Sequence, residues 1–573
     1  MKQESVKRLI DVAVNRVEPD LIIRGAQVVD VFNGRIIEGD VAIVDGLIAG
    51  IGSYTGENVF DAEGAFLLPG FIDGHVHIES SYVDPPSFAR LLLPRGTTTA
   101  IVDPHEICNV NGLDGFDYMV DASRSLPLSI FFMLPSCVPS SLFENSGAVL
   151  LADSLAKRMD RPEVLGLGEM MDSVGTVGAD PAVIDKIMLA KKAGKWIDGH
   201  APGVSGNDLN AYAGAGIHTD HECTTPEELV DRIERGMYVL LREGSATKDL
   251  LNLLPGVTPQ NAHMCLFCTD DRQPKSILEE GHIDNHLRIA VEFGLDPITA
   301  IKMATLHAAN CYGLHDRGAI APGRRADLVL VNNLQDFAVS HVFLEGTLYK
   351  EDEKFKTHQI PDKVATKINI GNFHRDKFKL PLTSPRVRVI EIIGGAVVTN
   401  MVERQVLIDD QGYYVHDPSQ DIVKLAVVER HSGTGNVALA LITGYGLRHG
   451  AVATTIAHDA HNIIVAGDND DDMAFAVESL VTIGGGIVMV RDGKILDALT
   501  LPIAGLMTDK GGPWVSEKLQ KMLHIALHEL GIPENIDPFM TLSFMALPVI
   551  PHLKVTDLGL FDVDAFSFVP LEL

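Results

Sequence analysis

Between about residue 66 and residue 313, the sequence alternates apolar, β-rich runs with helical stretches. There are eight such runs, at residues 65–77, 97–105, 128–137, 164–170, 195–200, 215–221, 236–245 and 262–271. Strands that alternate with helices form parallel βαβ units, and eight of these units in ~250 residues have the length of one closed barrel. The sequence therefore predicts a (β/α)8 barrel over residues 66–315.

The segments that flank this predicted barrel have a pattern of their own. Residues 21–65 contain short β runs, and the turn at Asn33-Gly34 favours a β-hairpin. A similar pattern returns over residues 316–350. We expect these two segments to form one small β-sandwich module, preceded by an N-terminal amphipathic helix in residues 1–20.

With 573 residues, the chain is longer than one barrel and one small module require. Residues 351–385 are polar, with scattered lysines and prolines, and are predicted to form a connector. Residues 386–573 mix strand-like and helical patterns. The predicted fold class is therefore α/β, with a (β/α)8 barrel, a small β-sandwich module and a C-terminal mixed α/β domain. This last domain could cover the barrel mouth, form a subunit interface, or do both.

The formal net charge of -30 argues against a nucleic-acid polymer as partner, because phosphate binding needs a basic surface. A free base or nucleoside is not excluded, since it brings little or no phosphate charge. No segment is long and apolar enough to cross a bilayer, and the N-terminus lacks the apolar core of a signal peptide. We therefore expect a cytoplasmic protein without a membrane partner, whose six cysteines are reduced.

His75 and His77 give the strongest chemical signal in the sequence, at the end of the first predicted strand. Side chains at positions i and i+2 of a strand point to the same face, so the two imidazoles can hold one metal ion. They would do so at the C-terminal mouth of the barrel, where barrel active sites lie. The alternative is two half-buried histidines that hydrogen-bond to neighbours, and this pair alone leaves both interpretations open.

Four further ligating side chains end later predicted strands: Glu169, His200, His221 and Asp270. Buried carboxylates and imidazoles need partners, and several of them at one mouth would satisfy each other only weakly. Divalent ions would neutralise the group, which favours a metal centre over structural histidines. His105 and Glu106 follow the second predicted strand and face the same mouth, where His105 could add a ligand or contact a bound molecule.

The positions of these residues resemble the ligand pattern of the amidohydrolase superfamily. That family places His-x-His on strand one, a bridging ligand on strand four, histidines on strands five and six, and Asp on strand eight. The matching residues here are His75, His77, Glu169, His200, His221 and Asp270. The resemblance implies a metal-dependent hydrolase barrel, with one departure: many binuclear members have a carbamylated Lys on strand four, where this chain has Glu169. Because a carboxylate can also bridge two metals, a binuclear site is expected.

Within the superfamily, the sequence is most similar to the bacterial and archaeal adenine deaminases. The sequence motifs on which this resemblance rests are GHVHIESS (residues 74–81), DPHEICNVNG (103–112), GLGEMM (166–171), GHAPG (199–203) and TDHECTTPEE (219–228). The resemblance implies hydrolytic deamination of adenine to hypoxanthine and ammonia, with adenine as the small-molecule partner. It also points to Mn or Fe as the divalent metal, as does a carboxylate bridge with few thiols, while Zn is also compatible.

The resemblance also suggests roles for polar residues at the mouth. Asp270 is expected to take the proton of the attacking hydroxide and relay it to the leaving amine. Glu106 or Glu222 would protonate the purine ring, and the sequence does not choose between them. The candidate purine contacts are Glu79, Arg242 and Ser245.

Two other functions fit parts of the pattern. A cyclic amidase of the hydantoinase or dihydroorotase type would keep the fold, but the strand-four Lys expected of it is missing. A non-catalytic barrel that serves as a scaffold would have lost ligands, and every expected ligand is present. We expect the chain to self-associate as a homodimer or tetramer.

Two more clusters contain potential metal ligands. Cys265 and Cys268 have the spacing of a zinc motif, but positions i and i+3 of a strand face opposite sides and cannot share a metal without a bend. Residues 458–462, with the sequence His-Asp-Ala-His-Asn, are also dense in ligands. A solvated turn explains this stretch equally well, so its role stays open.

Overall fold

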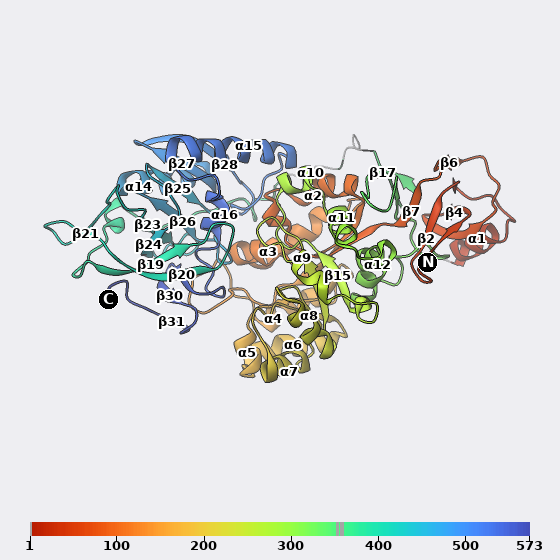
Figure 1. The fold of residues 1–573 in the computed structure, drawn as a ribbon, viewed down its shortest axis with the longest axis horizontal. Helices are drawn as coiled ribbons and strands as arrows, with labels where there is room; N and C mark the ends of the chain where they lie inside the picture. The colour runs from red at the N-terminus through yellow and green to blue at the C-terminus, as the bar shows by residue number, and fades with distance from the viewer. Residues whose placement is uncertain (1–2, 351–354, 356–359) are drawn as a thin grey trace.

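The computed structural model describes residues 3–350, 355 and 360–573, so the predicted connector at 351–385 lies partly outside the described residues. The described chain forms an elongated molecule with three parts in a row (Figure 1). A β-sandwich with the N-terminal segment lies at one end, a barrel lies in the middle, and the C-terminal domain lies at the other end. The predicted fold class is confirmed.

Eight parallel strands form the barrel, as the sequence predicts. They are β8 (Phe71–Val76), β9 (Thr97–Val102), β10 (Ser129–Leu134), β11 (Val164–Met170), β12 (Trp196–Gly199), β13 (Thr219–Asp220), β14 (Tyr238–Arg242) and β15 (Cys265–Cys268). Backbone hydrogen bonds from His77 N–H to Asp270 O (3.1 Å) and from Asp270 N–H to His75 O (2.9 Å) join β15 to β8. On the other side, His218 N–H donates to Ile197 O at 2.9 Å, which joins β12 to β13 and completes the ring.

Helices surround the barrel and connect its strands (Figure 1). The main ones are α2 (Pro85–Leu92), α3 (His105–Ser123), α4 (Ala152–Met159), α6 (Pro181–Ala193), α7 (Gly206–Gly214), α8 (Pro226–Glu234), α10 (Pro274–Glu279) and α11 (Ile283–Phe293). The start of α8 is a capping box in which Thr225 and Glu228 satisfy each other's backbone N–H groups. In the described part of the chain, no helix has the length and apolar character needed to span a membrane.

The β-sandwich is built from both flanks of the barrel. One sheet has the order β5 (Leu47–Gly52), β4 (Asp40–Val44), β1 (Leu21–Arg24) and β6 (Val59–Asp61). The other has the order β18 (Thr347–Leu348), β17 (Val339–Leu344), β16 (Leu328–Val331), β7 (Phe66–Pro69), β2 (Gln27–Asp30) and β3 (Arg35–Glu38). Ile23 and Ile43 of the first sheet share a buried core with Leu67 and Leu328 of the second. Helix α1 (Gln3–Ala13) packs against β4 and β5.

The run at residues 65–77 forms two strands, where the sequence pattern predicts one. Strand β7 pairs with β2 and β16 in the sandwich, whereas β8 pairs with β9 in the barrel. The chain changes sheets at Gly70, where an added Cβ would lie 2.1 Å from Thr98 Oγ1. An apolar run does not reveal this break, because both halves are buried.

The C-terminal domain centres on a mixed eight-stranded sheet. Its order is β20 (Thr399–Gln405), β19 (Arg386–Ile392), β24 (Val437–Thr443), β23 (Val423–Val428), β26 (Ile463–Gly467), β25 (Ala451–Thr454), β27 (Gly486–Arg491) and β28 (Lys494–Thr500). Helix α14 (Asp470–Ile483) packs against β25, β26 and β27. Helix α15 (Gly512–Ile525) contacts α10 of the barrel, and α16 (Pro538–Ser543) contacts β25 and β26. Strands β29 (Leu553–Thr556), β30 (Gly559–Asp562) and β31 (Ser567–Phe568) form a small separate sheet.

Arg232 on α8 connects the end of β13 to the segment that follows β12. Its side chain, 1% exposed, donates to Asp220 Oδ2 at 2.9 Å and to Ala201 O at 2.8 Å. We predict that Arg232→Ala lowers the free energy of unfolding by about 3–5 kcal/mol, because it leaves Asp220 as an unpaired buried charge. Urea denaturation followed by circular dichroism measures this loss.

The matched control is Arg235→Ala, just beyond the end of the same helix. The ion pair between Arg235 and Asp231 is more exposed, so its removal should cost below about 1 kcal/mol. Equal losses in the two variants would contradict the importance of the buried pair.

Candidate metal centre

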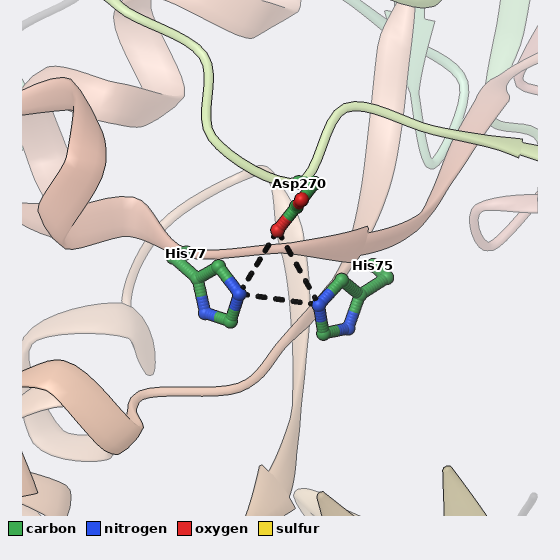
Figure 2. A group of neighbouring side chains, drawn as sticks. All are labelled: His75, His77 and Asp270. Carbon is green, nitrogen blue, oxygen red and sulfur yellow. Dashed lines mark hydrogen bonds and ion pairs between the residues drawn. The ribbon is translucent and has the colours of Figure 1, made fainter. Parts of the chain in front are cut away.

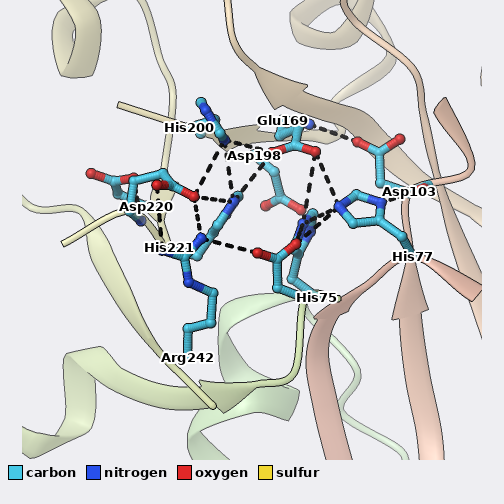
Figure 3. Close-up of polar contacts among 12 residues, drawn as sticks. His75, His77, Asp103, Glu169, Asp198, His200, Asp220, His221 and Arg242 are labelled. Atoms are coloured by element: carbon cyan, nitrogen blue, oxygen red, sulfur yellow. Dashed lines mark hydrogen bonds and ion pairs between the residues drawn. The ribbon is translucent and has the colours of Figure 1, made fainter. Parts of the chain in front are cut away.

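Six candidate ligands from five strands or strand ends meet at the C-terminal mouth of the barrel (Figure 2, Figure 3). They are His75 in β8, His77 just after it, Glu169 in β11, His200 after β12, His221 after β13 and Asp270 after β15. Five of them are buried and His200 is half-buried. The structure thus brings together every residue that matches the superfamily's ligand pattern.

His75, His77 and Asp270 form one half of the centre (Figure 2). The Nε2 atoms of the two histidines lie 3.2 Å apart, and Asp270 Oδ1 lies 3.1 Å from His77 Nε2 and 3.7 Å from His75 Nε2. Asp270 has a left-handed backbone with φ of 56°, which is unfavourable for a residue other than glycine. Its backbone hydrogen bonds to His75 and His77 hold it there, so barrel closure and ligand geometry depend on the same contacts.

Glu169 divides its two carboxylate oxygens between two groups of histidines. Oε1 lies 3.3 Å from His77 Nε2 and 3.2 Å from His105 Nδ1. Oε2 lies 2.9 Å from His200 Nδ1 and 3.2 Å from His221 Nε2. A carboxylate placed in this way can bridge two cations at the separation of about 3.5–4 Å that two-metal sites have.

Hydrogen bonds to Asp103 orient two of the candidate ligands, His77 and Glu169. His77 Nδ1 lies 2.8 Å from the backbone oxygen of Asp103, which leaves Nε2 to face the centre. The carboxylate of Asp103 accepts a hydrogen bond from Glu169 N–H at 2.9 Å. Such outer partners fix the tautomer and the direction of metal-binding side chains.

The electrostatics of these side chains suit a divalent cation. Burial raises the pKa of Glu169, but hydrogen bonds with His105 and other histidines outweigh it and hold the pKa well below its usual value. Burial raises the pKa of Asp270, but an adjacent histidine and arginine again hold it well below. Burial and the neighbouring His221 lower the pKa of His75. Burial lowers the pKa of His77 and of His221, but hydrogen bonds with neighbouring carboxylates outweigh it and raise both pKa values well above the usual value. A cation that binds there would therefore displace protons from these imidazoles. The ionised carboxylates and imidazoles together form a mixed donor set that fits divalent transition metals.

Glu106 joins the barrel to the C-terminal domain. It lies in the first turn of α3, and its Oε1 and Oε2 are hydrogen-bonded to His458 Nδ1 and His461 Nε2 respectively. Both histidines lie on the loop between β25 and β26. The ligand-rich stretch at residues 458–462, whose role the sequence left open, therefore lies at the barrel mouth.

Arg242, at the end of β14, contacts three carboxylates. Its guanidinium is bonded to Glu222, to Asp270 Oδ2 at 3.0 Å and to Asp249 Oδ2 at 2.9 Å. Burial raises the pKa of Glu222, but the charge of Arg242 outweighs this and holds the pKa far below its usual value. Arg242 thus orients the carboxylates of Glu222 and Asp270 beside the histidines of the centre.

A cavity of about 720 Å³ opens over these side chains. The barrel lines it with residues that include His77, His105, Glu106, Glu169, His200, His221, Glu222, Arg242 and Asp270. The C-terminal domain adds Val397, His458, Asp459, Phe544, Leu547 and Ile550. A cavity with apolar walls and a few converging polar groups suits a small planar molecule.

Two of the predicted purine contacts lie elsewhere. Glu79 Oε1 accepts a hydrogen bond from Ile107 N–H at 3.1 Å, near the start of α3. Ser245 Oγ lies 2.8 Å from Ser276 Oγ and lines a neighbouring cavity. Neither side chain is among the described residues that line the 720 Å³ cavity, so their contact with a purine stays a prediction.

Comparisons with known proteins identify the family of this chain. The model of the amidohydrolase family matches residues 66–349, and that of the adenine deaminase C-terminal domain matches residues 396–567. "Adenine deaminase 2" of Desulfotalea psychrophila is 54% identical, with all of both chains covered. The adenine deaminase of Nitratidesulfovibrio vulgaris is 55% identical, with 98% of each chain covered. The chain belongs to the adenine deaminase family.

A more distant likeness is seen among solved structures. A beta-aspartyl dipeptidase from Fervidobacterium islandicum AW-1 has a TM-score of 0.47 at 18% identity, covering 60% of this chain and 99% of that one. In this chain, the range that matches the C-terminal domain model includes His458, Asp459 and Phe544, which lie at the mouth. No strand pattern in the sequence marks these residues. The density of ligands at 458–462 pointed to His458 and Asp459, whereas nothing in the sequence pointed to Phe544.

We predict that Glu169→Ala lowers the metal content of the purified protein by at least one ion per chain, because both histidine groups lose their shared carboxylate. Inductively coupled plasma mass spectrometry measures the content. The control is Glu163→Ala, which removes a partly exposed ion pair with Arg124 and should keep the metal content of the unmodified protein. Full metal content in Glu169→Ala would refute a bridging role.

Proposed function

We propose that this chain hydrolyses adenine to hypoxanthine and ammonia. The observation that carries the proposal is the complete set of ligands at the barrel mouth, beneath a cavity of the size of a small planar molecule, in a chain whose full-length relatives are named adenine deaminases.

We further propose a pair of divalent ions, Mn or Fe, with Zn as the third choice. His75, His77 and Asp270 would hold one ion, His200 and His221 the other, and Glu169 both. The metals, when bound, supply the means to deprotonate water near neutral pH. This assignment is supported by the contacts of Glu169, because its Oε1 faces His77 whereas its Oε2 faces His200 and His221.

Asp270 is suited to move the proton of the attacking water. Its low pKa keeps it ionised near neutral pH, so it can accept that proton and pass it to the amine that leaves C6. Arg242, 3.0 Å from Asp270 Oδ2, directs the carboxylate, while Oδ1 faces His77.

For the proton that the purine ring must gain, we favour Glu106 over Glu222. Glu222 is paired with Arg242, whose guanidinium stays charged and has no proton to hand on. Glu106 is bonded to His458 and His461. Burial lowers the pKa of His458, but the charge of Glu106 outweighs it and raises the pKa to about 9, so His458 carries a proton near neutral pH. The carboxylate of Glu106 can relay this proton from His458 to a ring nitrogen.

The test is ammonia release from adenine by protein loaded with Mn2+ and by protein treated with a chelator. We expect release that depends on the metal, with adenosine and cytosine as control substrates that are not deaminated. Absence of release from adenine by the loaded protein would refute the proposed substrate.

Asp270→Asn tests the proton-transfer step separately. We predict a loss of kcat of about 10²-fold or more, the contribution typical of a positioned acid–base group, with metal still bound. Steady-state kinetics and metal analysis of the same preparation provide both values. Unchanged kcat would remove Asp270 from this role.

The alternative of a cyclic amidase is not favoured by the relatives, which are adenine deaminases along their whole length. A non-catalytic scaffold is equally disfavoured, because all six ligands are in place. Assembly as a homodimer or tetramer remains a prediction from the sequence.

A further inference from the structure

The loop between β25 and β26 brings a carboxylate, Asp459, into the cavity of the metal centre. Asp459 is 3% exposed and lines the cavity together with Glu169, His221 and Asp270. It belongs to the C-terminal domain and has no part in the ligand set or in the proton steps proposed above.

Asp459 lacks the hydrogen-bond partners that its neighbours have. Its Oδ2 is buried and has no partner among the described residues, and its Oδ1 lies 3.9 Å from His105 Nε2, too far for a hydrogen bond. By contrast, Glu106 is bonded to two histidines, and Asp271 accepts a hydrogen bond from Ser80. Because a buried carboxylate without a donor is unfavourable, a ligand that brings an N–H group into the cavity would stabilise it.

The position of Asp459 suits the far edge of a purine. The ring of His105 lies between the two carboxylates, with Nδ1 3.2 Å from Glu169 Oε1 and Nε2 facing Asp459. The two carboxylates therefore lie on opposite sides of the His105 ring, and both line the cavity. A purine with its six-membered ring at the metal centre can direct its five-membered ring toward Asp459. Phe544 and Leu547 line the same cavity and provide apolar surface for the flat faces of the rings.

We propose that Asp459 accepts a hydrogen bond from the imidazole-ring N–H of the free base, and that it thereby selects free adenine over purines substituted at N9. This inference rests on the proposed adenine deamination. The N9 position carries a hydrogen in the free base and a carbon in a nucleoside. Since an ionised carboxylate only accepts hydrogen bonds, an N9 substituent would leave a buried charge without a donor.

The experiment compares the unmodified protein with Asp459→Ala and Asp459→Asn on two substrates. Adenine is the first, and 9-methyladenine is the matched control, since it lacks the N9–H. We expect Asp459→Ala to lower kcat/KM for adenine about 10- to 100-fold, the range for a hydrogen bond to a charged group. For 9-methyladenine we expect no loss and a gain where the unpaired charge opposes binding, because the variant removes that charge. Where turnover of 9-methyladenine is too slow, its inhibition constant against adenine replaces kcat/KM. Asp459→Asn keeps an acceptor oxygen and should lie between the other two proteins.

Metal analysis of the same preparations completes the test, and we expect unchanged content in both variants. Equal losses on both substrates would overturn the inference, since Asp459 would then act on the fold or the centre and not on N9. A lower metal content in Asp459→Ala would overturn it as well, because Asp459 would be a ligand. Adenine turnover by the unmodified protein separates the two claims: its absence overturns the proposed function, whereas turnover with an unchanged substrate ratio in the variants overturns only the role of Asp459.

Discussion

The carboxylate of Glu169 is the contact on which the rest of the site depends. It lies at the mouth of the closed barrel, with the histidine that follows β8 and the first residue of α3 at one oxygen and histidines that follow β12 and β13 at the other. Without a counter-charge, so many imidazoles and carboxylates in a buried place would be unfavourable. Shared hydrogen bonds and the predicted cations balance them, and the closed ring of strands holds them at the distances that binding requires.

The site is completed by a second domain. Glu106, in the first turn of a barrel helix, is hydrogen-bonded to two histidines from a loop of the C-terminal sheet. The same loop brings Asp459, and a following segment brings Phe544, to the wall of the cavity. The C-terminal domain therefore shapes the space above the metal centre, in addition to any role in assembly, and its folding is coupled to the geometry of the barrel mouth.

Buried charge is paired with different partners in different parts of the molecule. Arg232 and Asp220 form a buried ion pair near the strand ends, and neither residue is among the described residues that line the cavity. At the mouth, Arg242 is shared among three carboxylates that line the cavity. Asp459 differs from both, because one of its oxygens has no donor among the described residues. This contrast separates a carboxylate that stabilises the fold from one that is available to a ligand.

The sequence by itself predicted the barrel, the flanking sandwich and the meeting of the six candidate ligands, because the carboxyl ends of all strands of a parallel barrel lie at one mouth. It also favoured Glu169 as the bridge, since no lysine stands at that position. Only the tertiary structure decided the division of residues 65–77 between two sheets, the position of Glu79 away from the cavity lining and the arrival of His458 and Asp459. These features depend on packing between segments far apart in the chain, and local periodicity carries no information about which loop of one domain reaches another.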